Sequence, residues 1–238
     1  MYVTISTDHG TASQTEGMQG AQARFSENVQ APTVRVRAGS YLYYEGDPVE
    51  RLYEVASGVV RLTRLLEDGR RQVIAFGYPG DIIGFPAGDC HHTDCDAISD
   101  ATLHSYRRSA LDTGDGDPAL HAKLLQAALR EISAMQDHFM MLGRKSAAER
   151  VASFLSVLLD RNGGPAGAYR QITLPMSRAD IADFLGLTIE TVSRCFTALR
   201  KSGVIALQGS HTVILLDDAA LRAQSHGQPK PAAGSRAA

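Results

Sequence analysis

The chain has 238 residues, of which 44% are hydrophobic and 21% are charged, and its formal net charge at pH 7 is −2. This composition is typical of a globular protein, and the small net charge argues against a protein that coats nucleic acid without sequence preference. Every apolar run is interrupted before the roughly 18–20 residues that a membrane span needs. The N-terminus lacks the basic and apolar segments of an export signal. We therefore expect a cytoplasmic protein without a membrane partner.

The predicted elements lie between two polar, aperiodic stretches. Residues 1–31 and residues 218–238 have the composition of disordered tails. In residues 32–115, glycines recur every 11–12 residues, at positions 46, 58, 69 and 80. Strand-like segments lie between and beyond these glycines, at residues 41–44, 52–55, 59–65, 72–76 and 103–106. Such regular turns predict a β-sandwich or barrel, although the spacing by itself suits any all-β domain.

Residues 116–144 change to a helical period. Pro118 suits the first turn of a helix, and apolar residues follow at alternating spacings of three and four. They are Leu125, Ala128, Ile132, Met135, Phe139 and Leu142. Such a seam predicts a dimerisation helix. The alternative is a helix packed on its own domain, and further apolar residues at 124, 129 and 140 widen the stripe enough for both contacts.

Residues 145–217 predict a second domain. Ser146 and Glu149 form a capping box that begins a helix, which ends before the Asn-Gly-Gly-Pro sequence at 162–165. A short strand follows at residues 171–175. Two further strands, at residues 203–207 and 212–215, flank a polar turn and predict a hairpin near the end of this domain.

Between these strands lies a helix-turn-helix pattern. Ser177 and Asp180 form a capping-type start for the first helix. Gly186 supplies the sharp turn, and Thr188 is a suitable N-cap for the second helix. With the hairpin behind it as the wing, this pattern predicts a winged helix-turn-helix.

The second of these helices carries the candidate base-reading residues. Its predicted buried stripe is Val192, Cys195, Phe196 and Leu199. Glu190, Ser193 and Arg194 fall outside that stripe, one helical turn apart. Arginine can donate two hydrogen bonds to guanine, glutamate can accept one from cytosine, and serine can bond a base edge. An alternative is a plain Glu190–Arg194 ion pair on a solvated helix, which the capped partner helix and the glycine turn disfavour.

Residues at the two helix starts are candidates for phosphate contacts. Hydroxyls, a guanidinium and free backbone amides gather there, and all of these groups suit phosphate oxygens. The candidates are Ser177, Arg178, Thr188 and Thr191.

Four motifs in residues 35–217 carry a family resemblance. They are AGSYLYYEGDPVERLYEVASGVVRL, GDIIGF, KSAAERVASFL and LPMSRADIADFLGLTIETVSR. The chain resembles the CRP/FNR superfamily of bacterial transcription regulators, and most of all its FNR/FixK branch. The resemblance implies an α+β fold, with an N-terminal cyclic-nucleotide-binding-like β-roll (a jelly roll), a long dimerisation helix and a C-terminal winged helix-turn-helix.

The resemblance also implies a function. The chain would be a transcription regulator and not an enzyme, acting as a homodimer on double-stranded DNA. Glu190, Ser193 and Arg194 would read a TTGA-type half-site, within an inverted repeat such as TTGAT-N4-ATCAA. The hairpin at residues 67–70 would contact RNA polymerase during activation, although a solvated turn explains the same residues.

The resemblance does not extend to an effector site. Cyclic-nucleotide binders carry Gly-Glu-Leu and an Arg-Ser or Arg-Ala pair, whereas residues 84–88 here are Gly-Phe-Pro-Ala-Gly. FNR proteins hold an iron–sulfur cluster on N-terminal cysteines, but residues 1–40 contain none. FixK-type members lack the cluster too. We therefore expect no cofactor.

Three cysteines leave alternatives open. Cys90 and Cys95 flank two histidines and could hold a metal or haem in a ligand-gated regulator, act as redox thiols, or lie in an ordinary surface loop. Cys195 is predicted as a small hydrophobe of the helix core, with redox inhibition as a second possibility. A cupin-like metalloenzyme is a remote alternative, because the adjacent His91 and His92 would point to opposite faces of a strand.

Overall fold

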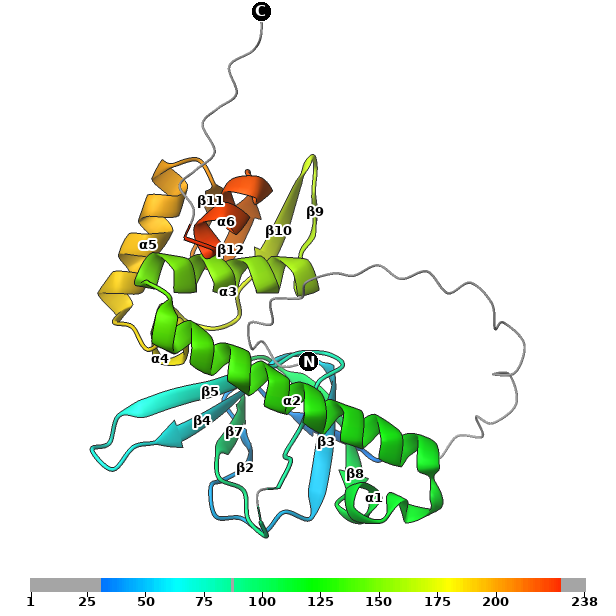
Figure 1. Ribbon diagram of the computed structural model, residues 1–238. Coiled ribbons are helices and arrows are strands. Elements are labelled where there is room, and N and C mark those ends of the chain that lie inside the picture. Colours follow the sequence, from blue (N-terminus) through cyan, green and yellow to red (C-terminus); the bar gives the residue numbers. More distant parts are fainter. Residues whose placement is uncertain (1–30, 87, 228–238) are drawn as a thin grey trace, which may run out of the picture.

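The computed structural model describes residues 31–86 and 88–227 (Figure 1). The predicted N-terminal tail, apart from residue 31, lies outside the described residues, as do residues 228–238. The chain has an α+β fold in which a long helix lies across a β-roll and leads into a smaller helical domain with its own sheet (Figure 1). Among the described helices, none is both long and apolar enough to cross a membrane.

Two four-stranded antiparallel sheets form the β-roll. One has the order β1–β8–β3–β6, made of β1 (Thr33–Val36), β8 (Ala101–Arg107), β3 (Arg51–Ser57) and β6 (Ile82–Ile83). The other has the order β2–β7–β4–β5, made of β2 (Tyr41–Tyr43), β7 (Asp94–Ala97), β4 (Val60–Leu65) and β5 (Arg71–Gly77). The alternate apolar residues of both sheets meet in one core, as in a sandwich.

The five predicted strands are confirmed within two residues at each end, whereas β1, β6 and β7 were not predicted. In β7, Asp94 and Asp96 are of a residue type that is depleted in strands, so the segment resembles a polar loop. The carboxylate of Asp94 accepts the backbone N–H of Glu45 at 2.8 Å, and that of Asp96 accepts two hydrogen bonds from Arg61. These partners allow two acidic residues to lie in the strand between β2 and β4.

The predicted long helix is α2 (Pro118–Arg144), which follows α1 (Ser109–Asp112) and a 3₁₀ turn at Gly114–Gly116. Asp117 caps it by accepting the backbone N–H groups of Ala119 and Leu120, each at 3.0 Å, and Pro118 occupies the first turn as expected. The side of α2 that packs on the rest of the chain carries Leu124, Ala127, Ala134 and Met141. The helix is therefore anchored along one side.

The C-terminal domain follows the predicted order, with one short strand and one final helix that were not predicted. It contains α3 (Ala147–Asn162), β9 (Gly164–Ala166), β10 (Tyr169–Thr173), α4 (Arg178–Leu185), α5 (Ile189–Lys201), β11 (Ile205–Gln208), β12 (Thr212–Leu215) and α6 (Asp218–Ser225). Its sheet has the order β11–β12–β10–β9. The core of this domain continues into the β-roll, because Val73, Phe76 and Tyr78 pack in the same cluster as Phe154 and Phe184.

Helix α6 corrects the prediction of a disordered tail from residue 218. Its buried residues Ala220 and Leu221 pack in the core of the domain, and the chain folds back along α3. The sequence signal was weak, because eight residues with a single large apolar side chain, Leu221, are too few to show a helical period. The docking surface on α3 decides the structure here.

The N-cap of α6 gives a first testable prediction. The Asp217 carboxylate accepts the Ala220 backbone N–H at 2.9 Å, so Asp217→Ala is expected to lower the free energy of unfolding by about 1 kcal/mol. Asp218→Ala is the matched control, because Asp218 makes only an exposed ion pair with Arg222, of the kind worth about 0.3–0.5 kcal/mol. Urea unfolding followed by circular dichroism measures both changes. Equal effects would contradict the capping role.

Candidate nucleic-acid interface

Local capping interactions build the two helices of the motif. The Ser177 hydroxyl accepts the Asp180 backbone N–H at 3.1 Å, and the Asp180 carboxylate accepts the Ser177 backbone N–H at 3.0 Å. This capping box begins α4. Gly186 ends it with φ of 61°, in the left-handed region that glycine tolerates best. Thr188 begins α5 by accepting the Thr191 backbone N–H at 3.2 Å, so all three sequence predictions are confirmed.

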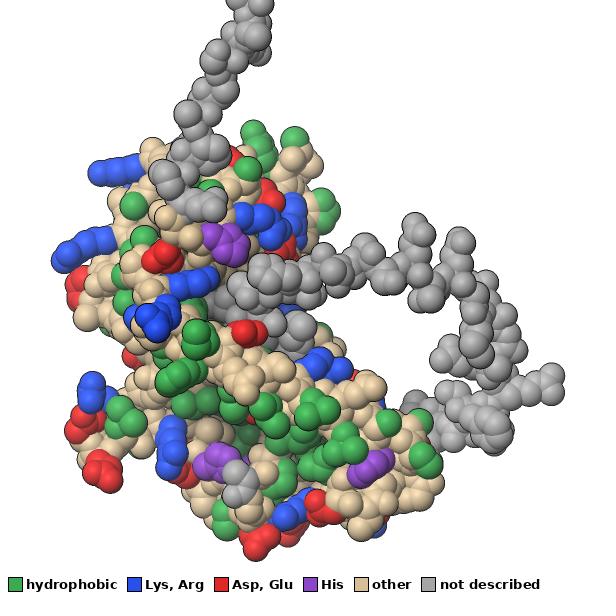
Figure 2. Space-filling view, in the orientation of Figure 1, with side chains coloured by type: hydrophobic (Ala, Val, Ile, Leu, Met, Phe, Trp, Pro, Cys, Tyr) green, Lys and Arg blue, Asp and Glu red, His purple; other side chains and the backbone are tan. Residues whose placement is uncertain are grey.

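Helix α5 has one buried face and one open face. Val192, Phe196 and Leu199 are buried, and Cys195 packs at the edge of the same core. Glu190, Ser193 and Arg194 are exposed. Figure 2 shows Lys and Arg side chains projecting from the edge of the molecule where α5 lies. An open hollow on this helix is lined by Ser193, Arg194, Thr197, Ala198 and Lys201. The geometry therefore presents the three candidate base-reading residues together.

Electrostatics keep Glu190 ionised on this face. Its own backbone N–H, the Thr188 hydroxyl and the charge of Arg194 all lower the pKa of Glu190. An ionised carboxylate can accept from a cytosine amino group or orient the neighbouring guanidinium. Beside it lies Ile189, an exposed apolar side chain that was not singled out from the sequence and that could contact a thymine methyl group.

The four candidate phosphate contacts are placed differently from one another. The Ser177 hydroxyl already donates to the Asp180 carboxylate at 2.7 Å, so its proton is used within the cap. The Arg178 guanidinium lies 3.5 Å from the centre of the Phe196 ring, which holds it beside α5. The hydroxyls of Thr188 and Thr191 lie 3.1 Å apart. The Thr188 hydroxyl also hydrogen-bonds the Glu190 carboxylate, so this pair is already engaged at the start of α5.

The predicted dimer seam lies on an open face of α2. Leu125, Ile132, Met135 and Phe139 are exposed, while Ala128 and Leu142 are half-buried. Hydrophobic side chains gather over α2 in Figure 2. This face adjoins the side of α2 that packs on the β-roll, so the helix presents two apolar faces. A row of exposed apolar side chains along one helix is typical of an interaction surface.

Arg150 of α3 is a structural residue that no sequence pattern pointed to. Its guanidinium donates to three backbone carbonyls, those of Leu142 at 2.7 Å, Lys145 at 2.9 Å and Leu185 at 3.0 Å. The Leu142 carbonyl belongs to the end of α2, that of Lys145 to the link between α2 and α3, and that of Leu185 to the end of α4. Arg150 therefore ties the helix-turn-helix to the long helix. A local pattern cannot mark such a residue, because one of its partners is distant in the sequence.

Comparisons with known proteins decide the family. Residues 33–113 match the cyclic nucleotide-binding domain, and residues 149–224 match the Crp-like helix-turn-helix domain. The nitrogen fixation regulation protein FixK of Rhizobium meliloti (strain 1021) is 42% identical over 186 residues, which are 78% of this chain and 83% of that protein. The chain belongs to the CRP/FNR family.

Other CRP/FNR proteins agree with this assignment. The nitrogen fixation regulation protein FixK of Azorhizobium caulinodans is 44% identical over 193 residues, covering 80% of this chain and 77% of that protein. The structure of FixK2 from Bradyrhizobium japonicum has a TM-score of 0.74 and 38% identity, covering 85% of this chain and 99% of that one. The chain is therefore a FixK/FNR-type transcription regulator with a DNA-binding helix-turn-helix, and not an enzyme.

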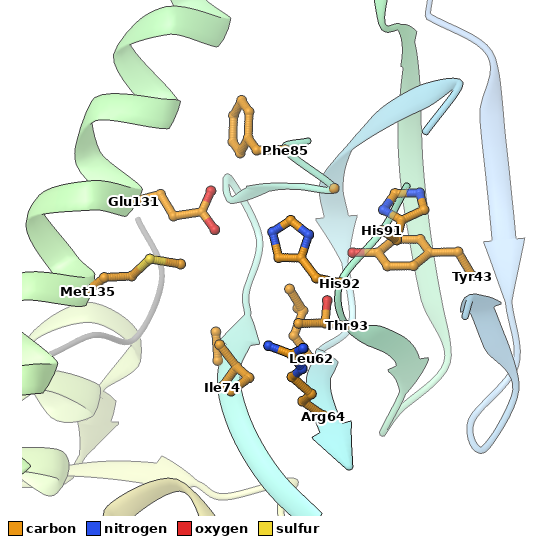
Figure 3. Close-up of a pocket in the computed structure, with 12 residues that line it drawn as sticks. Tyr43, Leu62, Arg64, Ile74, Phe85, His91, His92, Thr93, Glu131 and Met135 are labelled. Atoms are coloured by element: carbon orange, nitrogen blue, oxygen red, sulfur yellow. The ribbon is translucent and has the colours of Figure 1, made fainter. Parts of the chain in front are cut away.

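The β-roll of this chain contains a cavity whose size and lining do not suit a cyclic nucleotide. Glu131 and Met135 reach from α2 towards His92 and Phe85 of the β-roll (Figure 3). The cavity has about 180 Å³, below the roughly 300 Å³ at which ligand pockets begin. Its arginine, Arg64, is paired with Glu45 at 3.2 Å. A carboxyl group and an arginine that already has a partner are poor ligands for a phosphodiester.

The candidate metal ligands in the loop from Cys90 to Cys95 do not converge on one point. Cys95 lies in β7 with 0% exposure, whereas Cys90 is exposed. His91 stacks on Tyr43 with ring centres 3.7 Å apart, and His92 faces the cavity instead (Figure 3). The described residues hold no group of three or more metal-ligating side chains. The cupin-like enzyme is wrong, because the relatives are transcription regulators, and the four side chains of this loop point apart because β7 draws Cys95 into the core while Cys90, His91 and His92 precede that strand.

The cysteines give a second testable prediction. Burial raises the pKa of both the Cys95 and the Cys195 thiol, which lowers their thiolate content at any given pH. A thiol reagent is expected to label exposed Cys90 first, half-buried Cys195 more slowly and Cys95 only on unfolding. Mass spectrometry of timed samples at about pH 8, near the ordinary pKa of a thiol, measures the order, with Cys90→Ser as the control. Rapid labelling of Cys95 would contradict its place in the core and restore it as a redox candidate.

Proposed function

We propose that this chain is a homodimeric transcription activator that reads a TTGA-type inverted repeat in double-stranded DNA. The exposed face of α5 carries the proposal, because Glu190, Ser193 and Arg194 lie together on it and all three are open to solvent. Ser193 keeps the arrangement of the FNR/FixK branch. Thr188, Thr191 and the backbone amides at the two helix starts would bind phosphates, with Arg178 beside them.

The open face of α2 supports a homodimer. A two-fold axis along the seam would bring the exposed side chains of Leu125, Ile132, Met135 and Phe139 against the same residues of a second copy. In this proposal residues 32–115 form the β-roll domain, residues 116–144 the dimerisation helix, and residues 145–217 with α6 the DNA-binding domain. Two symmetric copies of α5 would then meet the two halves of an inverted repeat.

The tip of the β4–β5 hairpin supports recruitment of RNA polymerase. Leu65 and Leu66 are exposed there, beside the charged side chains of Glu67, Asp68 and Arg70. The hairpin projects away from the body of the molecule (Figure 1). An apolar tip rimmed by charges is suited to a protein partner.

Site selection tests the proposal. The full chain is incubated with a random duplex pool, bound DNA is sequenced, and the selected duplex is titrated by mobility shift. We expect an inverted repeat of TTGA-type half-sites and a complex with two protein chains. Selected sequences without symmetry would contradict the dimer, and enrichment without TTGA would contradict the assigned reading residues. Transcription with purified RNA polymerase, compared between wild type and Leu65→Ser/Leu66→Ser, tests activation separately.

A further inference from the structure

Four charged side chains join the β-roll to α4 across the domain boundary. Arg61 of β4 donates to Asp180 of α4, and it also holds Asp96 with two hydrogen bonds of 3.0 and 2.7 Å. Arg71 of β5 donates to Asp180 at 2.7 Å and to Asp183 at 2.8 and 3.0 Å. We call Arg61, Arg71, Asp180 and Asp183 the interdomain clamp. Figure 1 shows the β4–β5 hairpin reaching beneath α4, where these contacts form.

The ion pairs of the interdomain clamp have a fixed geometry, and the pair between Arg61 and Asp180 is largely shielded from water. The Asp180 side chain is 8% exposed and that of Arg61 is 16% exposed. Burial acts to raise the pKa of Asp180, but the hydrogen bonds from Ser177 and the charge of Arg61 outweigh it and lower that pKa. The ion pairs therefore persist at neutral pH. Because paired guanidinium and carboxylate groups require fixed geometry, these contacts define an orientation, which the apolar packing of Phe76 on Phe184 does not do alone.

The interdomain clamp acts on the DNA-binding motif itself. Asp180 is also the third residue of the α4 capping box, so the β-roll is bonded to the start of the motif. Gln72 adds a bond from its side-chain amide to the Asp183 carbonyl. At the other end of α4, Arg150 binds the Leu185 carbonyl. Helix α4 is thus fixed at both ends, while the reading face of α5 stays exposed.

In a two-fold dimer, the orientation of each DNA-binding domain sets the distance between the two copies of α5, and therefore the spacing of the half-sites they can bind. Each copy of α5 must enter a major groove, and the two grooves lie about 34–36 Å apart along the DNA. If each helix-turn-helix could rotate about the link between α2 and α3, one dimer would accept several spacings between half-sites. We infer that the interdomain clamp fixes the orientation of each helix-turn-helix relative to the β-roll and thereby selects the spacing of the two half-sites. This inference rests on the proposed dimer and inverted repeat, and it makes Arg61 and Arg71 positioning residues.

A series of DNA duplexes that differ only in half-site spacing, called the operator ladder, tests this inference. Two TTGA-type half-sites are separated by spacers that differ in single base pairs, and a duplex with one half-site serves as the reference. Arg71→Gln is the main variant, because the Arg71 side chain is 34% exposed and its loss disturbs the core least. Arg71→Lys, which keeps the charge, is the conservative variant. Arg35→Gln on the exposed side of β1 makes the same charge change away from the clamp.

Wild-type protein and Arg35→Gln are expected to prefer one spacer. Arg71→Gln should lose about tenfold affinity at that spacer and flatten the dependence on spacing, while its affinity for the single half-site stays unchanged. Arg71→Lys should restore part of the preference. An unchanged ladder in Arg71→Gln would overturn the inference, as would an equal loss of affinity at every spacing and at the half-site. Wild-type protein without any preference would instead overturn the proposed function and the inference with it.

Discussion

Phe139→Asp is expected to convert the protein to monomers at concentrations at which the wild type is dimeric. Phe139 is 75% exposed in the single chain and lies on the open face of α2. Burying a phenylalanine contributes about 1.5–3 kcal/mol, and a two-fold interface contains the residue twice, so the dimer should weaken by about 3–6 kcal/mol. That corresponds to about 10²–10⁴-fold in the dissociation constant. An introduced carboxylate in the seam adds to this effect.

Light scattering and analytical ultracentrifugation measure this change, and mobility shift shows its consequence for DNA. Binding to the inverted repeat should fall together with dimerisation, because each monomer then contacts only one half-site. Ser133→Asp is the matched control, since Ser133 is exposed on α2 and lies off the seam. A Phe139→Asp protein that remains dimeric would show that the two copies meet elsewhere.

Arg194→Ala is expected to weaken binding to the cognate inverted repeat by about 1–3 kcal/mol in each half-site, which is about 5–150-fold in affinity for each copy of the residue. Arg194 is exposed on the reading face of α5, next to the ionised Glu190. A bidentate pair of hydrogen bonds to guanine contributes both affinity and choice of base. Selectivity at one base pair of each half-site should therefore relax together with affinity.

Titration of duplexes that carry each base at every half-site position measures both effects. Arg200→Ala is the control, because Arg200 is an exposed arginine in the last turn of the same helix. It removes the same charge from α5 without touching the reading face. If Arg194→Ala bound all sequences more weakly by the same factor, Arg194 would bind phosphate and not a base. If affinity did not change, the Glu190–Arg194 pair would be the solvated surface pair that the sequence also allowed.

The helix-turn-helix could be predicted in detail because its signals are local. A capping residue and its partner lie three positions apart, as in Ser177 and Asp180, and a glycine with positive φ marks the turn at Gly186. The helical period then separates Val192 from Ser193 without any knowledge of the rest of the molecule. The seam on α2 follows from the same kind of periodicity. The family motifs placed these local features in one architecture.

Other features depended on residues far apart in the sequence. Asp94 and Asp96 resemble a loop until Glu45 and Arg61 provide their partners, and the resulting strand buries Cys95 and separates the supposed metal ligands. Helix α6 is too short to show a period and is stable because Leu221 docks on the domain core. A composition that suits a loop or tail can therefore still be ordered by tertiary partners.

Short-range patterns were enough to identify the two helices of the helix-turn-helix, the outward-facing residues of α5 and the apolar face of α2, since each of these rests on contacts within a few residues. How the helix-turn-helix is held depends instead on the folded chain. Arg61 and Asp180 are 119 positions apart, and Arg150 meets Leu185 across 35 positions. In the sequence, Arg61 and Arg150 look like ordinary surface residues, and Asp180 is marked only as a capping residue. Their role arises because charged groups removed from water must find partners, and the fold alone brings those partners together.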